Sequence, residues 1–397
     1  MNRLENTLGS QIVNLPISSS NIEKTLQFLQ EYVKPEQVTP IIETCRDVFG
    51  CVMQNPVLLV GGRGTSQIIK FEANNHPYIC RVVDATRPSF FIDPESEIHN
   101  MWAVNNLDVA PKLHHADLQA GIIIMDYIQP TRLTTDTLDD EQQISHLYAE
   151  LGKKAKLLHG GPSFTETATN VFDDLESTLQ TAKIDRAPDV AREVLEHVRN
   201  LAPVLNRHEV CTPCHKDLHS NNILLTDKSA FFIDWELGAN CNRFVDLACL
   251  SIFFVFDAKY DDLLLEHYFG EKPTEEQQAQ LFLMKQVCLA FYGIRLLRRV
   301  TGIGGMDLSK EQVNPNSLPA FRDFILSKYN CCSESFTTEQ LKVFPFMFLH
   351  EAKKNIDSAR FSEAIRVLTQ DTNMVEMNAP DSPKSRIESE MKFFAEL

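Results

Sequence analysis

Apolar residues recur at helical spacing near the start of the chain. In residues 19–50 this pattern predicts two short helices that are separated at Lys34-Pro35. Ser20 or Asn21 is suited to cap the first helix, because short polar side chains accept hydrogen bonds from the first backbone N–H groups of a helix. No residue type in this segment indicates catalysis.

Between residues 55 and 128 the pattern changes to short β-rich runs separated by glycine, asparagine and proline. The predicted order is strand, glycine turn, strand, turn, strand, helix, strand, strand. We expect a small antiparallel sheet with one helix against it. The runs, in order, are PVLLVGG, SQIIKFE, PYICRVV, the helical PESEIHNMWAVNNL, PKLHHAD and AGIIIMDYI.

Beyond QPTRL the chain is predicted to be largely helical, with one interruption. There, NILL and AFFIDW form two short strands joined by the turn TDKS. We therefore expect an α+β fold with a small β-rich part and a larger, mainly helical part. The expected boundaries are a helical extension at 1–52, the β-rich part at 53–128, the helical part with the hairpin at 129–372, and a polar tail at 373–397.

The composition is that of a globular protein, and the net charge argues against one class of partner. Hydrophobic residues make up 43% of the 397 residues and charged residues 23%, so the chain can bury the cores of two or three packed units. The net charge of -16 argues against nucleic acid, which requires a basic binding surface. It is compatible with a cationic substrate, although a solvated acidic surface is the more common explanation.

The N-terminal residues lack a basic region followed by an apolar core, so we expect no secretory signal. No window approaches the roughly 18 uninterrupted apolar residues of a membrane-spanning helix. The ten cysteines show no regular spacing, which favours reduced thiols. We therefore expect a cytoplasmic protein without a membrane span.

Residues 211–236, CTPCHKDLHSNNILLTDKSAFFIDWE, contain the densest group of reactive side chains. Cys211 and Cys214, followed by His215 and His219, allow a zinc site as one interpretation. A structural zinc site usually needs a second CxxC or HxxxH pair at a compatible distance, and no such pair follows. Buried thiols on a strand that leads into the loop are the better interpretation.

The same residues fit a loop for phosphoryl transfer. His215-Lys216-Asp217 with Asn222 matches H-x-D-x-x-x-x-N, the pattern of a kinase catalytic loop. In that chemistry Asp217 accepts the proton of the substrate hydroxyl, and His215 braces the loop by hydrogen bonding. Asn222 offers an amide oxygen to Mg²⁺, and Asp234, at the end of the hairpin, supplies a carboxylate to the same ion.

The predicted sheet supplies candidates for binding the phosphates of a nucleotide. Gly62, Gly64 and Thr65 lie between the first two strands, where glycine lets backbone N–H groups approach phosphates. Most such turns are simple hairpins, so this signal is weak alone. Arg81 on the third strand is suited to bind phosphate, and Glu97 on the following helix is suited to hold it by an ion pair.

These motifs resemble the choline kinase and aminoglycoside phosphotransferase superfamily over about residues 55–300, and CHKDLHSNNILL with FFIDWELGANCNRFVDLA is most similar to bacterial choline kinases. The resemblance implies a protein-kinase-like two-lobe fold, ATP and Mg²⁺ as cofactors, and the residue roles given above. Arginine at position 81, where protein kinases have lysine, agrees with the choline kinase branch. The backbone of Asp126, Tyr127 and Ile128 would be the hinge that reads adenine.

The features that bind a peptide substrate in protein kinases are absent. Asp234-Trp235-Glu236 replaces Asp-Phe-Gly, and no Ala-Pro-Glu follows. Only about a dozen residues separate Asp234 from Asp246, which leaves no room for an activation loop. We therefore expect a small-molecule acceptor.

Glu236, Asp246 and Trp235 are the candidates to line the acceptor site. Carboxylates and an aromatic face suit an ammonium group, which favours a small cationic alcohol similar to choline or ethanolamine. The only tryptophans are Trp102 and Trp235, so the C-terminal tryptophan that is frequent in choline kinases is missing. Aminoglycosides and thiamine therefore remain alternative acceptors, and Asp246 fits a role in bracing the catalytic loop equally well.

Two other classes of function remain open. A regulatory protein could keep the kinase fold without turnover, although the intact metal ligands argue against it. A zinc hydrolase could use His215, Asp217 and His219. The segments outside residues 55–300 lie beyond the resemblance, and they leave homodimerisation open.

Overall fold

The protein is described by a computed structural model in which the chain divides into two compact units. The structure describes residues 19–59, 66–83, 94–131, 140–164, 168–181, 187–254, 258–303, 307–308, 313–329 and 338–378. The first unit comprises Met1–Ala168, Thr212–Asn240 and Ile325–Ser335, and the second comprises Thr169–Cys211, Cys241–Phe324 and Phe336–Leu397. The hairpin at residues 222–235 thus belongs to the same unit as the β-rich part, and the expected domain boundaries remain predictions.

The N-terminal segment forms two helices, as the sequence pattern predicts. They are α2 (Ser19–Tyr32) and α3 (Pro35–Phe49), with Pro35 at the start of the second helix, where its missing N–H costs nothing. Gly50 ends α3 in a left-handed conformation, with φ at 70°, and its N–H donates to the carbonyl of Arg46. This is a common way to end a helix.

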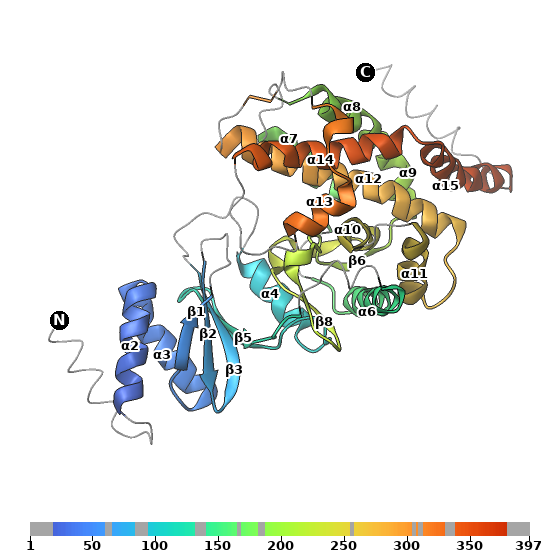
Figure 1. The fold of residues 1–397 in the computed structure, drawn as a ribbon. Coiled ribbons are helices and arrows are strands. Elements are labelled where there is room, and N and C mark those ends of the chain that lie inside the picture. The colour runs from blue at the N-terminus through green and yellow to red at the C-terminus, as the bar shows by residue number, and fades with distance from the viewer. Residues whose placement is uncertain are drawn as a thin grey trace, which may run out of the picture. The chain divides into compact units, whose positions relative to one another are not determined.

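The β-rich part is a five-stranded antiparallel sheet in the order β1-β2-β3-β5-β4, which confirms the predicted order of strands and helix (Figure 1). A two-residue turn at Asn74-Asn75, both with positive φ, joins β2 to β3 and matches the twist of a hairpin. Its elements are β1 (Gln54–Leu58), β2 (Ser66–Ala73), β3 (His76–Val83), α4 (Pro94–Val104), β4 (Leu113–Asp117) and β5 (Ile122–Asp126).

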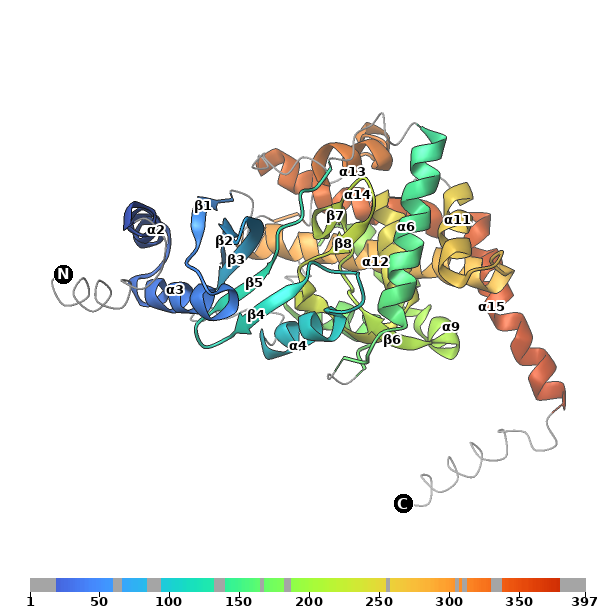
Figure 2. The same cartoon turned by 90° about the horizontal axis from the view of Figure 1, so that it is seen from below.

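The two N-terminal helices cover one face of this sheet, with α2 against the edge strand β1 and α3 against the other edge strand, β4 (Figure 2). Leu29 and Ile41 on the helices pack in one core with Phe71 and Cys80 on the strands, and all four are fully buried. Side chains alternate between the faces of a strand. Arg81 therefore lies on the opposite face from Cys80, away from α2 and α3.

The rest of the first unit is built around a long helix and the hairpin. Asp140 caps α6 by accepting hydrogen bonds from the N–H groups of Gln142 and Gln143. The predicted hairpin is confirmed, with Ile223 opposite Phe232 in an antiparallel pair. The elements are α6 (Glu141–His159), β6 (Cys211–Cys214), η4 (Ser220–Asn222), β7 (Ile223–Leu225), β8 (Ala230–Phe232), η5 (Trp235–Leu237) and β9 (Ala239–Asn242).

The second unit is helical and centres on α12, which packs against α7, α8, α10, α14 and α15. With its continuation to Thr301, α12 is long and apolar enough to span a membrane, but 78% of that window is buried, as in the core helix of a globular unit. The elements are α7 (Val171–Thr181), α8 (Asp189–Arg199), α9 (Ala202–Leu205), η3 (Asn206–His208), α10 (Phe244–Phe254), α11 (Ala258–Phe269), α12 (Glu275–Arg298), the π-helical η6 (Arg299–Ile303), η7 (Pro315–Ser317), α14 (Thr338–Ile356) and α15 (Ala359–Asn378). The helix α13 (Phe321–Tyr329) begins in this unit and ends in the first.

Candidate active site

His215 braces the loop that follows β6, as its position in the motif predicts. The imidazole is fully buried, and its Nε2 lies 2.9 Å from the carbonyl oxygen of Ile233. Its Nδ1 accepts a hydrogen bond of 3.3 Å from the N–H of Asp217, so Nε2 carries the proton and donates. Because both ring nitrogens are engaged within the protein, His215 is a poor zinc ligand, and the zinc hydrolase hypothesis loses one of its three ligands.

The loop holds Asp217 and Asn222 against each other. The Nδ2 of Asn222 donates to the backbone carbonyl of Asp217 over 2.9 Å, which leaves the Asn222 Oδ1 as the atom that can face a cation. The N–H of Asn222 donates to the carbonyl of His219, and its own carbonyl accepts from the N–H of Ile233. The motif aspartate, the motif amide and the residue before Asp234 are therefore fixed in one hydrogen-bonded frame.

Asp234 leaves the hairpin in a left-handed conformation, with φ at 68° and ψ at 67°. This conformation is uncommon for residues with a Cβ and is frequently found at functional sites. Lys216, beside the motif aspartate, also has a positive φ of 67°. The carboxylate of Asp217 is buried and lies 3.8 Å from the Nε2 of His219, whereas Asp234 is exposed. One carboxylate is therefore held inside the loop and the other is presented to solvent.

Arg81 and Glu97 form the predicted ion pair between β3 and α4. The Arg81 Nη1 lies 2.5 Å from the Glu97 Oε1, and Nη2 lies 3.3 Å from Oε2. Burial acts to lower the pKa of the Arg81 guanidinium, but Glu97 raises it by charge and hydrogen bonding, and Asp234 and Glu236 raise it further, so that the pKa lies above its ordinary value. The pair and the end of the hairpin therefore lie within electrostatic range of each other.

The charge of this group suits a divalent cation. Arg81 bonds to Glu97, and Asp234 and Glu236 lie within electrostatic range of it, so these four groups together carry +1 against -3. Carboxylate and amide oxygens are the ligands that Mg²⁺ prefers in proteins. Asn222 and Asp234 therefore fit a magnesium site by donor chemistry and by charge.

Two backbone N–H groups at the end of β5 are already hydrogen-bonded within the β-rich part. The N–H of Asp126 donates to the carbonyl of Lys112 over 2.9 Å, and the N–H of Tyr127 donates to the carbonyl of Pro77 over 3.2 Å. The Asp126 carboxylate lies 2.7 Å from the Nε2 of His114. Of the three hinge N–H groups expected to read adenine, only that of Ile128 makes no such bond within the described part of the chain.

Two further predicted residues stand in different surroundings from those expected. Trp235 was expected to line the acceptor site, but it is only 2% exposed, and its ring packs on His215, with centroids 4.7 Å apart, and edge-on against Phe164. The left-handed turn at Asp234 directs the indole into the core, so the expectation for Trp235 was wrong. Asp246 lies in the first turn of α10 in the second unit and is fully buried, which favours its structural interpretation.

Other predicted residues need no correction. Glu236 is partly exposed and lies in η5, within electrostatic range of Arg81. Gly62, Gly64 and Thr65 lie outside the described residues. These three remain predictions.

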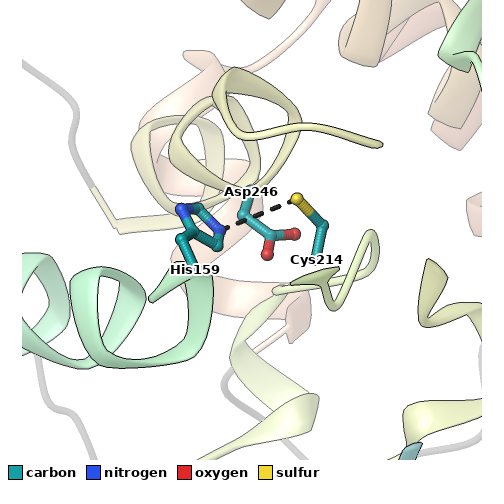
Figure 3. Close-up of side chains that lie close together, drawn as sticks. All are labelled: His159, Cys214 and Asp246. Carbon is teal, nitrogen blue, oxygen red and sulfur yellow. Dashed lines mark hydrogen bonds between the residues drawn. The ribbon is translucent and has the colours of Figure 1, made fainter. Parts of the chain in front are cut away.

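Two contacts that the motifs did not reveal hold this region together. The side chain of Asn100, 1% exposed on α4, donates to the carbonyl of Gly238 over 2.7 Å. A Cβ at Gly238 would lie 2.9 Å from the Asn100 Nδ2, so glycine permits this approach. The Sγ of Cys214 lies 3.8 Å from the Nε2 of His159, which connects the end of α6 to the strand before the loop of Asp217 (Figure 3).

Comparisons with known proteins show the family of this chain. The model of the phosphotransferase enzyme family matches residues 61–281. Protein LicA of Haemophilus influenzae is 24% identical over 240 residues, which cover 58% of this chain and 69% of that protein. A choline/ethanolamine kinase family protein from Mesorhizobium loti has a similar structure, with a TM-score of 0.61 and 16% identity over 83% of this chain and 99% of that chain.

A second solved structure with the same fold is the choline kinase LicA from Streptococcus pneumoniae. It has a TM-score of 0.53 and 17% identity, and the match covers 73% of this chain and 96% of that chain. At these identities the structural likeness establishes the fold alone. The family match, which spans more than half of the chain, shows that this protein belongs to the phosphotransferase enzyme family and is a kinase of the choline kinase and aminoglycoside phosphotransferase superfamily.

Proposed function

We propose that this kinase transfers the γ-phosphoryl group of ATP to the hydroxyl of a small cationic alcohol of the choline or ethanolamine type. The observation that carries this proposal is the shared frame of Asp217, Asn222 and Ile233, which fixes a buried carboxylate and an amide beside the exposed Asp234. Relatives named as choline or ethanolamine kinases support the choice of acceptor class.

In the proposed reaction Asp217 is the base. The acceptor oxygen bonds to the γ-phosphorus as the bond from that phosphorus to the β–γ bridging oxygen breaks. The hydroxyl proton passes to the Asp217 carboxylate, and ADP leaves. His215 and Asn222 hold the loop on both sides of Asp217 through the bonds described above, so the carboxylate needs little rearrangement to reach the hydroxyl.

The nucleotide is held by charge at one end and by the backbone at the other. Asn222 and Asp234 would hold Mg²⁺, which, when bound, neutralises charge on the phosphates. Arg81, fixed by Glu97, would contact the phosphates. The Ile128 N–H is the proposed donor to adenine, because the N–H groups of Asp126 and Tyr127 already bond to the sheet.

Recognition of the acceptor then depends on charge more than on an aromatic cage. Glu236 is the proposed carboxylate that attracts the ammonium group, since the buried ring of Trp235 cannot supply a cation–π face. Aminoglycosides and thiamine, which also carry positive charge, are the alternative acceptors within the same fold.

A screen for ADP release tests the proposal. Purified protein with ATP and Mg²⁺ is assayed with choline, ethanolamine, thiamine and a panel of aminoglycosides, and each activity is repeated with Asp217→Asn. We expect turnover with choline or ethanolamine that the variant loses. Turnover with an aminoglycoside or thiamine alone selects the alternative acceptor. Tight ATP binding without transfer to any acceptor selects the regulatory protein instead.

We propose a cytoplasmic location, where ATP is supplied and thiols stay reduced. All eight cysteines in the described part of the chain are free, and seven of them are buried. Homodimerisation stays a prediction that a sedimentation experiment on the full chain decides.

A further inference from the structure

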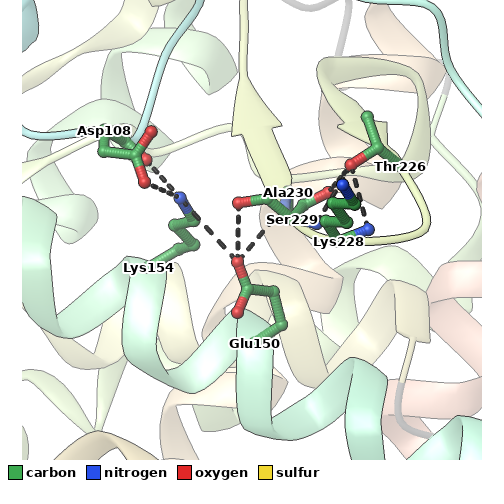
Figure 4. A network of polar contacts seen from close by, with 7 residues as sticks. All are labelled: Asp108, Glu150, Lys154, Thr226, Lys228, Ser229 and Ala230. Carbon is green, nitrogen blue, oxygen red and sulfur yellow. Dashed lines mark hydrogen bonds and ion pairs between the residues drawn. The ribbon is translucent and has the colours of Figure 1, made fainter.

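The ammonium group of Lys154, on α6, is buried and surrounded by acceptors. The side chain is 4% exposed, and Nζ bonds to the backbone carbonyl of Asp108, to its Oδ2 at 2.9 Å, and to Glu150 at 3.7 Å (Figure 4). The ring of Phe231 lies 5.1 Å from Nζ. A buried ammonium is costly unless its donors are paired, so these groups are held in place around it.

The partner on the same helix, Glu150, holds the turn of the catalytic hairpin. Its Oε1 accepts a hydrogen bond of 2.8 Å from the Oγ of Ser229 and one of 3.4 Å from the N–H of Ala230, the first residue of β8 (Figure 4). The turn is braced from within by Thr226, whose Oγ1 accepts from the N–H groups of Lys228 and Ser229. Glu150 therefore fixes the start of β8 to α6.

The other partner, Asp108, holds the end of the same strand. Asp108 has a positive φ of 55°, and the carbonyl of the next residue, Val109, accepts a hydrogen bond of 2.7 Å from the N–H of Phe232. Phe232 is the last residue of β8 and stands two residues before Asp234. Glu150 thus bonds to the start of β8, and Lys154 bonds to Asp108, whose neighbour Val109 bonds to the end of β8. This strand precedes Asp234.

The segment that Lys154 binds also follows directly from the helix of Glu97. This segment joins α4 to β4, and the side chain of Asn105 braces it through two hydrogen bonds with the backbone of Leu113, of 3.1 and 2.7 Å. One buried cation is therefore connected to the helix that holds Arg81 and to the strand that ends before the proposed metal ligand.

We propose that Lys154 and Glu150 are positioning residues for this kinase, which set the placement of Asp234 and Glu97 for binding of ATP with Mg²⁺. The inference rests on the proposed roles of those two carboxylates. Neither positioning residue touches a nucleotide in this proposal; both act through β8 and the segment after α4. Replacement of a residue that contacts and orients a metal ligand, without binding the metal itself, typically changes metal affinity or activity by about 10- to 100-fold.

The test uses the full chain with three variants and a matched control. Lys154→Met removes the ammonium and keeps an unbranched stem, and Ser229→Ala removes one bond at the turn, a mild change for which folding is not at risk. Ser229→Thr restores a hydroxyl. The control is Lys153→Met, because Lys153 is the neighbouring, exposed lysine of the same helix. The readouts are thermal unfolding, amide hydrogen exchange of residues 226–234, and the Mg²⁺ dependence of ATP binding by titration calorimetry, which needs no acceptor.

We expect Lys154→Met and Ser229→Ala to speed exchange in residues 226–234 and to raise the Mg²⁺ concentration needed for ATP binding, by about tenfold or more for Lys154→Met. Ser229→Thr and Lys153→Met should match the native chain. A lower melting temperature with native exchange and native Mg²⁺ dependence assigns Lys154 to stability alone and overturns the inference. If the native chain transfers phosphate to none of the acceptors, the proposed function is wrong. Faster hydrogen exchange in the variants would still support the connection between Lys154 and the hairpin in that case.

Discussion

The guanidinium of Arg81, on β3, donates two hydrogen bonds to the carboxylate of Glu97, on α4. Arg81 has two further carboxylates within electrostatic range, Asp234 and Glu236. Glu97 is thus the group that keeps the guanidinium from turning toward the proposed metal ligand. A two-point contact fixes the plane of the arginine as well as its charge.

Glu97→Gln should weaken ATP binding and lower stability. The amide cannot accept both guanidinium bonds, so Arg81 turns toward Asp234 and Glu236. We expect a loss of about 1–3 kcal/mol in the free energy of unfolding, because a buried charged group loses part of its partner. Calorimetric titration of ATP with Mg²⁺ and urea unfolding measure the two effects. Glu43→Gln, at an exposed position of α3, is the control. Native ATP affinity in Glu97→Gln would contradict the role of the pair.

Asp217→Asn should lower turnover by about two to four orders of magnitude, the range that general-base catalysis supplies. ATP affinity should stay close to native, because the proposed role of Asp217 concerns the acceptor hydroxyl. Steady-state kinetics and nucleotide titration separate the two quantities. Asp173→Asn, at an exposed position of α7, serves as control. A variant that keeps native turnover shows that the base is another group.

Asp234→Asn should raise the Mg²⁺ requirement and lower turnover by at least about 100-fold, because a carboxylate that holds the metal becomes a neutral amide. Asparagine tolerates the left-handed conformation that Asp234 adopts, and the change removes one of three clustered carboxylates. The melting temperature should therefore not fall. Turnover at increasing Mg²⁺ concentration and thermal unfolding give the two measurements. A fall in stability with native Mg²⁺ dependence contradicts the assignment.

The cysteines provide a test of the reduced, metal-free interpretation of the CxxC sequence. Burial, together with the nearby Cys51, raises the pKa of the Cys45 thiol to about 12, and burial raises that of Cys80 well above its ordinary value. Cys211 is the exposed thiol of the described residues. A thiol reagent at neutral pH should modify Cys211 in the native chain and reach Cys45 and Cys80 only after unfolding, as peptide mass analysis shows. Protection of Cys211 that a chelator removes would instead support a bound metal.

His350 should make the second unit less stable as the pH falls. Burial lowers the pKa of this imidazole below its ordinary value of 6.5, against an opposing effect of Glu193. Below 6.5 the unfolded chain takes up a proton more readily than the folded chain, so the stabilisation is complete above that pH and declines below it. Thermal unfolding between about pH 7.5 and 5.5 should show a smaller decrease in His350→Gln than in the native chain. Equal decreases in both chains remove His350 as the cause.

Much of the fold, and several contacts of the candidate site, could be predicted from the sequence, because the signals are local. The hairpin from Ile223 to Phe232 follows from two short apolar runs joined by a polar turn, and the five-residue interval from Asp217 to Asn222 is set within one loop. Arg81 and Glu97 were predicted to pair because they stand on a strand and on the next predicted helix, as in the kinase small lobe.

The other features of the site depend on tertiary contacts, which the spacing of residues in the sequence does not reveal. Lys154 and Glu150 stand four apart on a helix, a pattern that usually indicates an exposed ion pair, and only the tertiary packing buries Lys154. Trp235 became a candidate for the acceptor site because an aromatic ring beside Glu236 suits an ammonium group, and residue type does not show that the ring is buried after the left-handed turn at Asp234.

The bond from Asn100 to Gly238 spans 138 residues of sequence and so has a consequence for biosynthesis. At a translation rate of about 5–20 residues per second, roughly 7–28 seconds pass between the synthesis of its two ends. Throughout that interval α4 exists on the ribosome without the partner that fastens it beside η5. The bond between α4 and Gly238 can therefore form only after three described helices of the other unit, α7, α8 and α9, have been synthesised.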